Sequence, residues 1–276
     1  MKIDHSRCVG CGNCVIACPM GAIYVEEHLA YINDDECVEC GACLRFATPE
    51  GLPPWPVRLG RRLLEFLRLC YDQPLDVCPT TALYQEQLAW PRSLRQFFSD
   101  PTVAHPTTGI KGRGIEEIKT NDVTERLKPG EVGILIEFGR PGIGAHLYEV
   151  EFMTQALAPL GVRFEPKNPI TQLMTDVGTG ELDPAVLNEK VLSCILEVLV
   201  CNDGAPKVLK TISQVAGLLH TVVSLAINAR CGPNGEAPYE ELVAEAGLTL
   251  SPNGKTNLGL GLPAPSRGGQ VGRARA

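Results

Sequence analysis

The sequence has few aromatic residues and fewer basic than acidic side chains. Phe, Trp and Tyr make up 5% of its 276 residues, so the hydrophobic cores must consist mainly of aliphatic side chains. The 25 Lys and Arg residues against 32 Asp and Glu residues give a net charge of −7. This charge argues against a general binder of nucleic acid or of anionic membranes, because such proteins carry a basic face.

Long apolar segments are also missing. No run reaches the ~18 apolar residues that a transmembrane helix needs, so we expect no membrane span. The first residues, Met-Lys-Ile-Asp, lack the charged-then-apolar pattern of a secretory signal. These absences predict a cytoplasmic protein. The length of 276 residues leaves room for about two domains of ~100–200 residues.

Cysteine is the residue type that stands out, with 12 copies. The first run of closely spaced cysteines is Cys8-Val-Gly-Cys11-Gly-Asn-Cys14-Val-Ile-Ala-Cys18-Pro19. In a chain without an export signal, closely spaced cysteines indicate metal or cluster ligands rather than disulfides. The C-x2-C-x2-C-x3-C-P spacing is that of bacterial iron–sulfur sites. Three thiolates two residues apart can surround one side of a cluster, and Gly10 and Gly12 let the backbone come close to it.

A second run, Cys37-Val-Glu-Cys40-Gly-Ala-Cys43, lacks its fourth cysteine, because the regular spacing reaches Ala47. The segment Cys18-Pro-Met-Gly-Ala-Ile23 is repeated as Cys78-Pro-Thr-Thr-Ala-Leu83. This internal repeat identifies Cys78 as the displaced fourth ligand. Cys70, which lies in a helical pattern without a following proline, is the competing candidate; otherwise it is a buried thiol of that helix.

These motifs resemble the bacterial two-[4Fe–4S] ferredoxin family over residues 1–48 and 76–84. The resemblance implies that one cluster is held by Cys8, Cys11, Cys14 and Cys78, and the other by Cys37, Cys40, Cys43 and Cys18. The family's hairpin is visible as well, with strands at 22–25 and 29–32 around a polar turn. Ala47 is the departure from the family pattern, and it affects only the assignment of Cys78.

Residues 49–77 form an insertion before Cys78, and residues 85–130 form a connector. In the insertion, the spacing of Leu59, Leu63, Phe66, Leu67 and Cys70 predicts an amphipathic helix over 58–72. We expect this helix to pack on the next domain, the alternative being a partner subunit. In the connector, residues 91–98 favour a short helix, and the glycine- and cation-rich segment 109–114 is either a phosphate-binding loop or a linker.

From residue 131 to 230 the hydrophobic pattern indicates a second domain with the element order βαββαβ. Strands are predicted at 132–138, 162–164, 190–200 and 221–227, and helices at 147–160 and 203–219. Within the long segment 166–189, Asp183-Pro184 predicts the start of a short helix. The order is that of the split-βαβ, ferredoxin-like sandwich, so the predicted fold class is α+β, with a dicluster ferredoxin domain at 1–84 and this sandwich after it.

The segment Glu137-Phe-Gly-Arg-Pro-Gly142, followed by a helix, is similar to the opening of ACT domains. The resemblance implies edge-to-edge pairing into a homodimer. It also implies a small effector bound near the first turn, at Gly139, Arg140, Pro141, Gly142 and Gly144, beside the helix N-terminus. The alternative is a docking or dimerisation module that binds no ligand.

The C-terminal extension, 231–276, ends in a segment rich in Gly, Pro and Arg. Residues 252–276 contain four cations and no acid, a composition that predicts a disordered basic tail. Cys194, Cys201 and Cys231 are too few to hold a third four-thiolate cluster, so we expect them to be ordinary thiols.

The sequence therefore predicts an iron–sulfur electron-transfer protein or subunit. It would carry two [4Fe–4S] clusters and exchange single electrons with a partner oxidoreductase. No nucleophile–base pair or flavin-binding motif suggests catalysis by the chain itself. The competing hypothesis is a redox- or ligand-sensing regulatory protein whose clusters report to the ACT-like domain.

Overall fold

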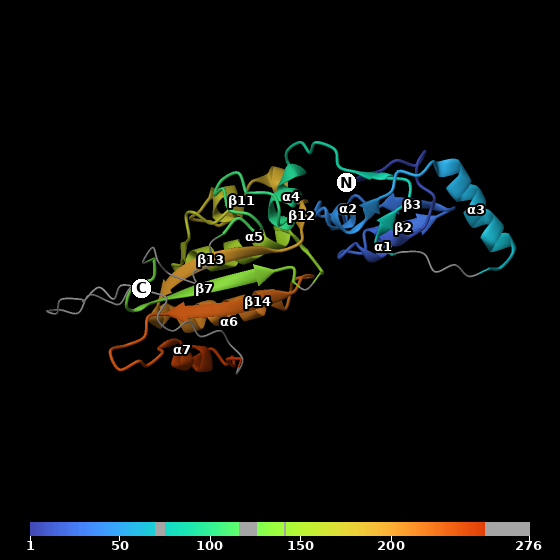
Figure 1. The fold of residues 1–276 in the computed structure, drawn as a ribbon. Helices are drawn as coiled ribbons and strands as arrows, with labels where there is room; N and C mark the ends of the chain where they lie inside the picture. Colours follow the sequence, from blue (N-terminus) through green and yellow to red (C-terminus); the bar gives the residue numbers. More distant parts are fainter. Residues whose placement is uncertain (70–74, 116–125, 141, 252–276) are drawn as a thin grey trace, which may run out of the picture.

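The computed structural model describes residues 1–69, 75–115, 126–140 and 142–251. The chain forms an N-terminal unit of short strands and helices and a C-terminal unit built on a four-stranded sheet (Figure 1). Predictions made above for Cys70, Pro141 and the tail 252–276 lie outside the described residues. No helix in the described part of the chain is long and apolar enough to cross a membrane.

The N-terminal unit repeats one arrangement of strand, cysteine-rich turn, short helix and strand. The first copy contains β1 (Lys2–Ile3), α1 (Asn13–Ile16) and β2 (Ile23–Glu26). The second contains β3 (Leu29–Ile32), α2 (Ala42–Phe46) and β6 (Leu83–Tyr84). The copies interlock, because β1 pairs with β6 and β2 pairs with β3, both antiparallel. The β2–β3 pair is the hairpin expected from the sequence.

The insertion leaves this repeat and returns to it at nearly the same place. It leaves at β4 (Thr48–Pro49) and returns at β5 (Val77–Cys78), and the two strands pair in parallel, with Pro49 opposite Cys78. Because its two ends are neighbours, the insertion does not disturb the rest of the repeat.

The insertion contains α3 (Pro54–Phe66), which begins earlier than the predicted start at residue 58. Pro53 precedes the helix, and Pro54 and Pro56 lie in its first turn, where the missing N–H groups cost no hydrogen bond within the helix. Pro54 and Pro56 are therefore part of the helix start, which extends the helix before the predicted position.

The expected packing of the inserted helix on the next domain is wrong. Helix α3 lies at the end of the molecule farthest from the C-terminal unit (Figure 1). Its apolar stripe points to solvent: Trp55, Leu59, Leu63 and Phe66 are 71%, 61%, 55% and 83% exposed. No residue of α3 is buried, and its arginine side faces the ferredoxin-like turns instead.

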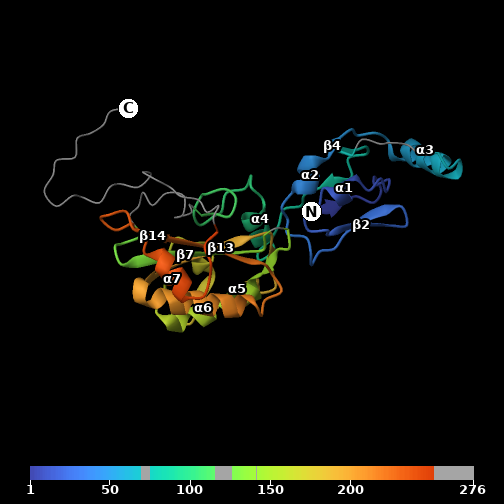
Figure 2. The same cartoon turned by 90° about the horizontal axis from the view of Figure 1, so that it is seen from below.

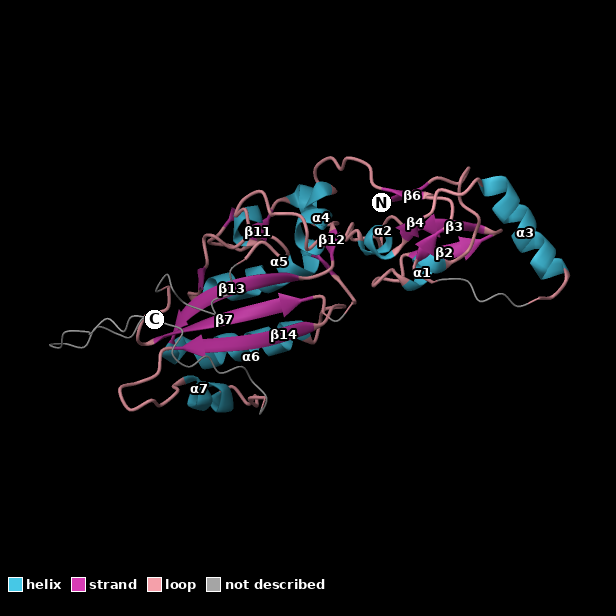
Figure 3. Ribbon diagram, viewed as in Figure 1, coloured by secondary structure: helices cyan, strands magenta, loops and turns pink. Residues whose placement is uncertain are grey.

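The sheet of the C-terminal unit has the strand order β14-β7-β13-β9, and all of its pairs are antiparallel. Its strands are β7 (Glu131–Phe138), β9 (Arg163–Phe164), β13 (Cys194–Cys201) and β14 (Val223–Ala229). Helix α5 (Leu147–Leu157) follows β7, and α6 (Ala205–Ala216) follows β13. The elements thus come in the expected βαββαβ order, with both helices on one face of the sheet (Figures 2 and 3).

Side chains of the central strands alternate between two faces. Ile134 and Ile136 of β7 belong to the same main core as Val150 and Met153 of α5. The opposite face, with Leu135 and Ile195, is covered in part by Leu127 just before β7. Both faces of β7 are therefore covered, which explains its nearly continuous apolar sequence.

The connector contains α4 (Ser93–Ser99), whose Leu94 and Phe98 are buried in the main core of the C-terminal unit. Helix α4 is thus packed against that unit rather than lying free between the two. Helix α4 also contacts the segment 190–200, where the predicted single strand is interrupted. The N–H of Leu192 donates to Ser99 Oγ of α4 (2.9 Å), so β12 (Lys190–Val191) pairs with β8 (Ala145–His146) and β13 begins only at Cys194.

Smaller elements complete the C-terminal unit. They are the hairpin β10 (Met174–Asp176) and β11 (Glu181–Leu182), helix α7 (Tyr239–Glu245), and 3-10 turns at Ala158–Leu160, Thr171–Leu173, Pro184–Val186 and Asn202–Gly204. The turn at Pro184 begins as predicted, because the Asp183 side chain accepts a hydrogen bond from the Ala185 N–H. Helix α7, in the C-terminal extension, was not expected from the sequence.

Candidate metal centre

The structure brings four cysteines together around one cavity in the N-terminal unit. This first cavity is lined by Cys8, Cys11, Cys14 and Cys78. Its other walls are mostly apolar: Ile3, Val9, Ala30, Ala47, Val77, Pro79, Ala82 and Leu83, among others. Cys78, separated from the other three by the insertion, is therefore beside them in space.

The position of Cys78 follows from the parallel pair β4–β5. This pair brings the returning chain back beside Thr48 and Pro49, directly after Ala47. The Asn13 Nδ2 also donates to the carbonyl of Val77 (2.8 Å), which ties β5 to α1. Ala47 and Cys78 line the same cavity, so the cysteine lies next to the position where the regular spacing requires one.

A second cavity is lined by the remaining four candidate ligands, Cys18, Cys37, Cys40 and Cys43. Three come from the second cysteine run, while Cys18 comes from the end of the first run. Cys18, the last cysteine of the first run, thus lies at the cavity of the second run, and Cys78 lies at the cavity of the first. The remaining lining residues include Met1, Pro19, Met20, Ile23, Ile32 and Val38.

Backbone N–H groups are directed at several of the sulfur atoms. The N–H of Ala22 donates to Cys18 Sγ (3.2 Å), and that of Ala82 donates to Cys78 Sγ (3.3 Å). These are equivalent contacts in the two Cys-Pro repeats. Cys8 Sγ accepts from the N–H of Ala30 (3.4 Å). Such donors stabilise negative charge on sulfur, as cluster ligation requires.

The cysteine turns depend on residues in the left-handed backbone region. Gly12 and Gly41, at equivalent places before α1 and α2, have φ of +80° and +66°. Gly10 has φ of +63°, and a Cβ there would lie 2.2 Å from the carbonyl oxygen of His28. The equivalent residue of the second run is Glu39, with φ of +55°. Only glycine fits at position 10, whereas the second run tolerates a side chain.

Burial shapes the acidity of the thiols. Desolvation, reinforced by the neighbouring cysteines, raises the pKa of Cys14 and of Cys43 to about 12. Desolvation also raises the pKa of Cys11, Cys37 and Cys40. Four thiols in one apolar cavity cannot all ionise unless a cation lies between them. Iron supplies that charge, so the donor set fits an iron–sulfur cluster in each cavity.

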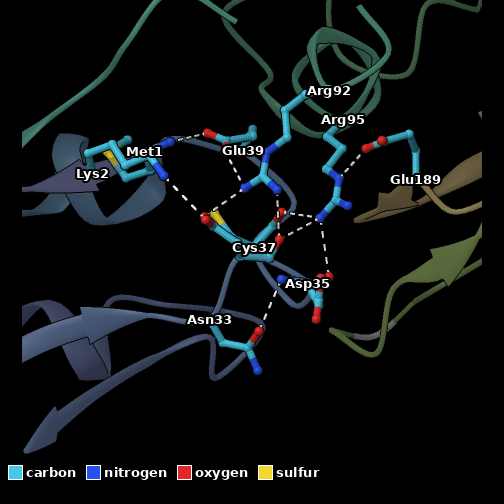
Figure 4. A network of polar contacts seen from close by, with 10 residues as sticks. Met1, Lys2, Asn33, Asp35, Cys37, Glu39, Arg92, Arg95 and Glu189 are labelled. Atoms are coloured by element: carbon cyan, nitrogen blue, oxygen red, sulfur yellow. Dashed lines mark hydrogen bonds and ion pairs between the residues drawn. The ribbon is translucent and has the colours of Figure 1, made fainter.

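A network of charged groups borders the second cavity, whose lining includes Met1 and Glu39 (Figure 4). Glu39, 1% exposed, accepts hydrogen bonds from the Met1 amino group and from Arg92 Nη2, the latter at 2.7 Å. Burial would raise the pKa of Glu39, but these cationic donors hold it below its usual value. Arg95 Nη1 donates to the carbonyl of Cys37 (2.9 Å). Arg92 directly precedes α4 and Arg95 belongs to it, so this cavity borders the C-terminal unit.

The first cavity has a different set of cations, supplied by α3. Arg58 Nη2 donates to the carbonyl of Cys8 (2.7 Å) and also to those of His5 and Ser6. Arg61 Nη2 lies 3.5 Å from the carbonyl oxygen of Gly10. The polar side of α3 is therefore fixed to the first cysteine turn, which explains why its apolar side faces outward.

The other cysteines and the predicted effector turn lie elsewhere. Cys194 is buried, with its pKa raised by desolvation, while Cys201 and Cys231 are exposed. Gly142 and Gly144 approach the ferredoxin-like unit: a Cβ on Gly142 would lie 3.3 Å from the Pro19 carbonyl oxygen, and one on Gly144 2.8 Å from Met20 Cε. Arg140 pairs with Glu137 (3.1 Å). The turn thus lies against the segment that follows Cys18.

Residues 1–46 match the family described as a 4Fe-4S dicluster domain. Similar curated proteins include a component of the ion-translocating oxidoreductase complex of Methanosarcina acetivorans, 51% identical over 45 residues, which are 16% of this chain and 17% of that protein. A ferredoxin of Mycobacterium tuberculosis is 55% identical over 31 residues, 11% of this chain and 27% of that protein. The polyferredoxin-like subunit of the aliphatic sulfonate oxidoreductase of Pyrococcus furiosus is 32% identical over 84 residues, 28% of this chain and 46% of that protein.

This chain spans less than half the length of each of these relatives. No solved structure matches it. The family match ends at residue 46, directly before Ala47, where the chain departs from the regular cysteine spacing.

The N-terminal unit is therefore of the dicluster ferredoxin type, and the family match and the ferredoxin relatives support two [4Fe–4S] clusters in it. The family match and the relatives support electron transfer and not the regulatory sensor considered from the sequence. They do not confirm that the C-terminal unit is ACT-like.

Proposed function

We propose that the chain is an electron-transfer component of an oxidoreductase complex and passes single electrons through its two clusters to or from a partner subunit. The main support is the pair of four-cysteine cavities. Each contains three cysteines of one run and a fourth from outside that group, Cys78 in the first cavity and Cys18 in the second. A [4Fe–4S] cluster in each cavity would supply the one-electron chemistry. The chain's own residues hold the clusters, limit their contact with water and direct N–H groups at the sulfurs.

The proposed ligands of the first cluster are Cys8, Cys11, Cys14 and Cys78, and those of the second are Cys18, Cys37, Cys40 and Cys43. The shared cavity walls support this division. The matching N–H contacts to Cys18 and Cys78 support equal roles for these two cysteines. Cys70 stays outside the proposal, because Cys78 already completes the first set of four.

Metal analysis tests this assignment. Protein purified or reconstituted without oxygen should contain about eight iron and eight sulfide per chain, because eight thiolates match two cubanes. It should also take up electrons reversibly. A count near four would contradict the proposal for one of the cavities.

The proposed partner is an oxidoreductase subunit in the cytoplasm, and the chain by itself is not the catalyst. Two relatives carry names of oxidoreductase complex subunits, which supports this class of partner. Anaerobic co-purification followed by rapid mixing tests it. The reduced chain should transfer electrons to a co-purified redox subunit, and failure to reduce any such subunit would contradict it.

For the C-terminal unit we propose an ACT-like module over 131–230, joined to the ferredoxin unit (1–84) by the connector 85–130 and followed by the extension 231–276. Its strand order and the position of both helices on one face of the sheet support the module.

The contact of Gly142 and Gly144 with Pro19 and Met20 favours docking over effector binding at the turn after β7. β14 is an edge strand, a place where two copies could pair. Light scattering tests for the homodimer.

A further inference from the structure

Arg95 of α4 holds the backbone of the second cysteine turn. The side chain is nearly buried, and its Nη1 donates to three carbonyl groups: those of Asp34 (2.9 Å), Asp35 (3.2 Å) and Cys37 (2.9 Å). One guanidinium nitrogen therefore gathers the segment that leads into the second cavity. The hydrogen bond to Cys37 reaches the backbone of a proposed cluster ligand directly.

The same guanidinium group is tied to the C-terminal unit. Its Nε donates to the carboxylate of Glu189, and that side chain is also largely buried. Glu189 lies directly before β12, and its backbone carbonyl accepts from the N–H of Leu147 at the start of α5. Figure 4 shows Arg95 between Cys37 on one side and Glu189 on the other. The cation thus lies nearer to the cysteine turn than its counter-ion does.

This order of charges has an electrostatic consequence. Reduction adds one negative charge to a cluster. A fixed cation beside the cluster stabilises the reduced form, and a fixed anion destabilises it. Both effects are stronger in a buried environment than in water, because the effective dielectric constant is lower. Arg92 differs from Arg95, because it donates to two carboxylates, those of Glu39 and Asp34, whereas Arg95 has one carboxylate partner, Glu189.

We propose that Arg95 is a positioning residue that couples the C-terminal unit to the cluster in the second cavity. It fixes the Cys37 turn and raises the reduction potential of that cluster, and Glu189 moderates the effect. The proposal rests on the proposed function, since it requires a cluster bound by Cys18, Cys37, Cys40 and Cys43. It gives the C-terminal unit a role in tuning electron transfer without a ligand of its own.

The test compares the full-length wild-type protein with Arg95→Gln and Glu189→Gln in redox titrations followed by electron paramagnetic resonance. Arg95→Gln should shift one of the two reduction waves to lower potential, because a cation is lost. Glu189→Gln should shift the same wave to higher potential, because an anion is lost. We expect a change on the order of tenfold in the reduction equilibrium, or ~59 mV for one electron.

Arg58→Gln is the matched control, because Arg58 donates to the carbonyl of Cys8 in the first turn. It should shift the other reduction wave and leave in place the wave that responds to Arg95→Gln. Glu189→Gln guards against misfolding, since it keeps Arg95 and its three carbonyl contacts. If Arg95 had a purely structural role, Arg95→Gln and Glu189→Gln would both lose iron, or both would shift the same reduction wave in the same direction.

Shifts of equal sign, shifts of both waves, or unchanged waves in iron-replete variants would each overturn the inference. Wild-type protein with fewer than two reducible clusters would instead overturn the proposed function. The two failures are therefore distinguishable.

Discussion

The two cysteine cavities arise from one repeat, yet different parts of the chain border them. The first turn is held by Arg58 of α3, in the insertion, and the second by Arg95 of α4, which packs into the C-terminal unit. Helix α3 has no buried residue, whereas α4 is anchored by Leu94 and Phe98. Both arginines donate to the carbonyl of a cysteine, so two unrelated helices provide the same contact.

The difference shows that the ligand pattern and its surroundings are separable. The cysteine turns need only the repeat, its left-handed positions and its two Cys-Pro segments. The cations come from helices that begin outside the repeat, and these helices decide what each cluster is next to. We expect changes in the repeat to affect the clusters themselves, and changes in the helices to affect stability and potential.

Removal of Cys78 should produce the largest difference between the two cavities. Cys78→Ala should destroy the cluster of the first cavity and leave the second, so that iron falls from about eight to about four per chain. Cys201→Ala, at an exposed cysteine of β13, is the control and should keep both clusters. Cys70→Ala should keep both as well. If Cys70→Ala lost a cluster and Cys78→Ala did not, the displaced ligand would lie in the insertion.

Equal truncations in the two supporting helices should have unequal effects. Leu94→Ala in α4 should lower the free energy of unfolding by about 2–5 kcal/mol, because Leu94 is 2% exposed in a packed core. Leu63→Ala in α3 should change it by less than ~0.5 kcal/mol, because that side chain is 55% exposed. Urea unfolding followed by circular dichroism measures both. A comparable loss at Leu63 would mean that another surface covers α3.

Within the first cysteine turn, the two left-handed glycine positions should differ in their tolerance of a side chain. Gly12→Ala should cost about 1–2 kcal/mol, the strain of a side chain in the left-handed region, since only Val25 comes within 4 Å of the added Cβ. Gly10→Ala should cost more, because the new Cβ would meet the His28 backbone. Thermal unfolding of the two variants without oxygen compares them. Equal costs would show that the hairpin moves away freely.

Much of the ferredoxin unit could be predicted from the sequence because its determinants are local. Spacing alone singled out seven cysteines, and the repeated Cys-Pro segment singled out Cys78. The contacts of Arg58 and Arg95 could not be predicted, because they join residues 50 and 58 positions apart by a single side chain. Periodicity found α3 but not its orientation. The apolar stripe indicates an amphipathic helix, yet here the arginine side has the backbone partners.

In the C-terminal unit the element order could be predicted, but not how α4 alters it. The apolar run at 190–200 gives no sign that Leu192 donates to Ser99 of α4 instead of to the sheet. Periodicity describes a strand and not its neighbours, so the break between β12 and β13 depends on a contact that is remote in sequence.

The smallest predicted effect concerns the attachment of α4 and its dependence on pH. His105 is 2% exposed and makes edge contacts with Phe97 and Phe98 of α4, at centroid distances of 5.8 and 5.0 Å. Its Nδ1 accepts a hydrogen bond from the Thr107 N–H (3.4 Å), and its Nε2 has no partner among the described residues. The ring is thus held in its neutral form, and desolvation lowers the pKa of His105 from 6.5 to about 4.

A histidine whose pKa is lowered on folding binds its proton more readily in the unfolded chain. Stability is therefore complete above pH ~6.5 and falls as the pH drops from there toward ~4. Between pH 7.5 and 5.5 this group should remove about 1 kcal/mol from the free energy of unfolding. His105→Gln should be less stable than wild type at pH 7.5 but should lose less stability on going to pH 5.5. Urea unfolding of both proteins at the two pH values gives the difference. An equal loss in both would mean that other groups carry the pH dependence.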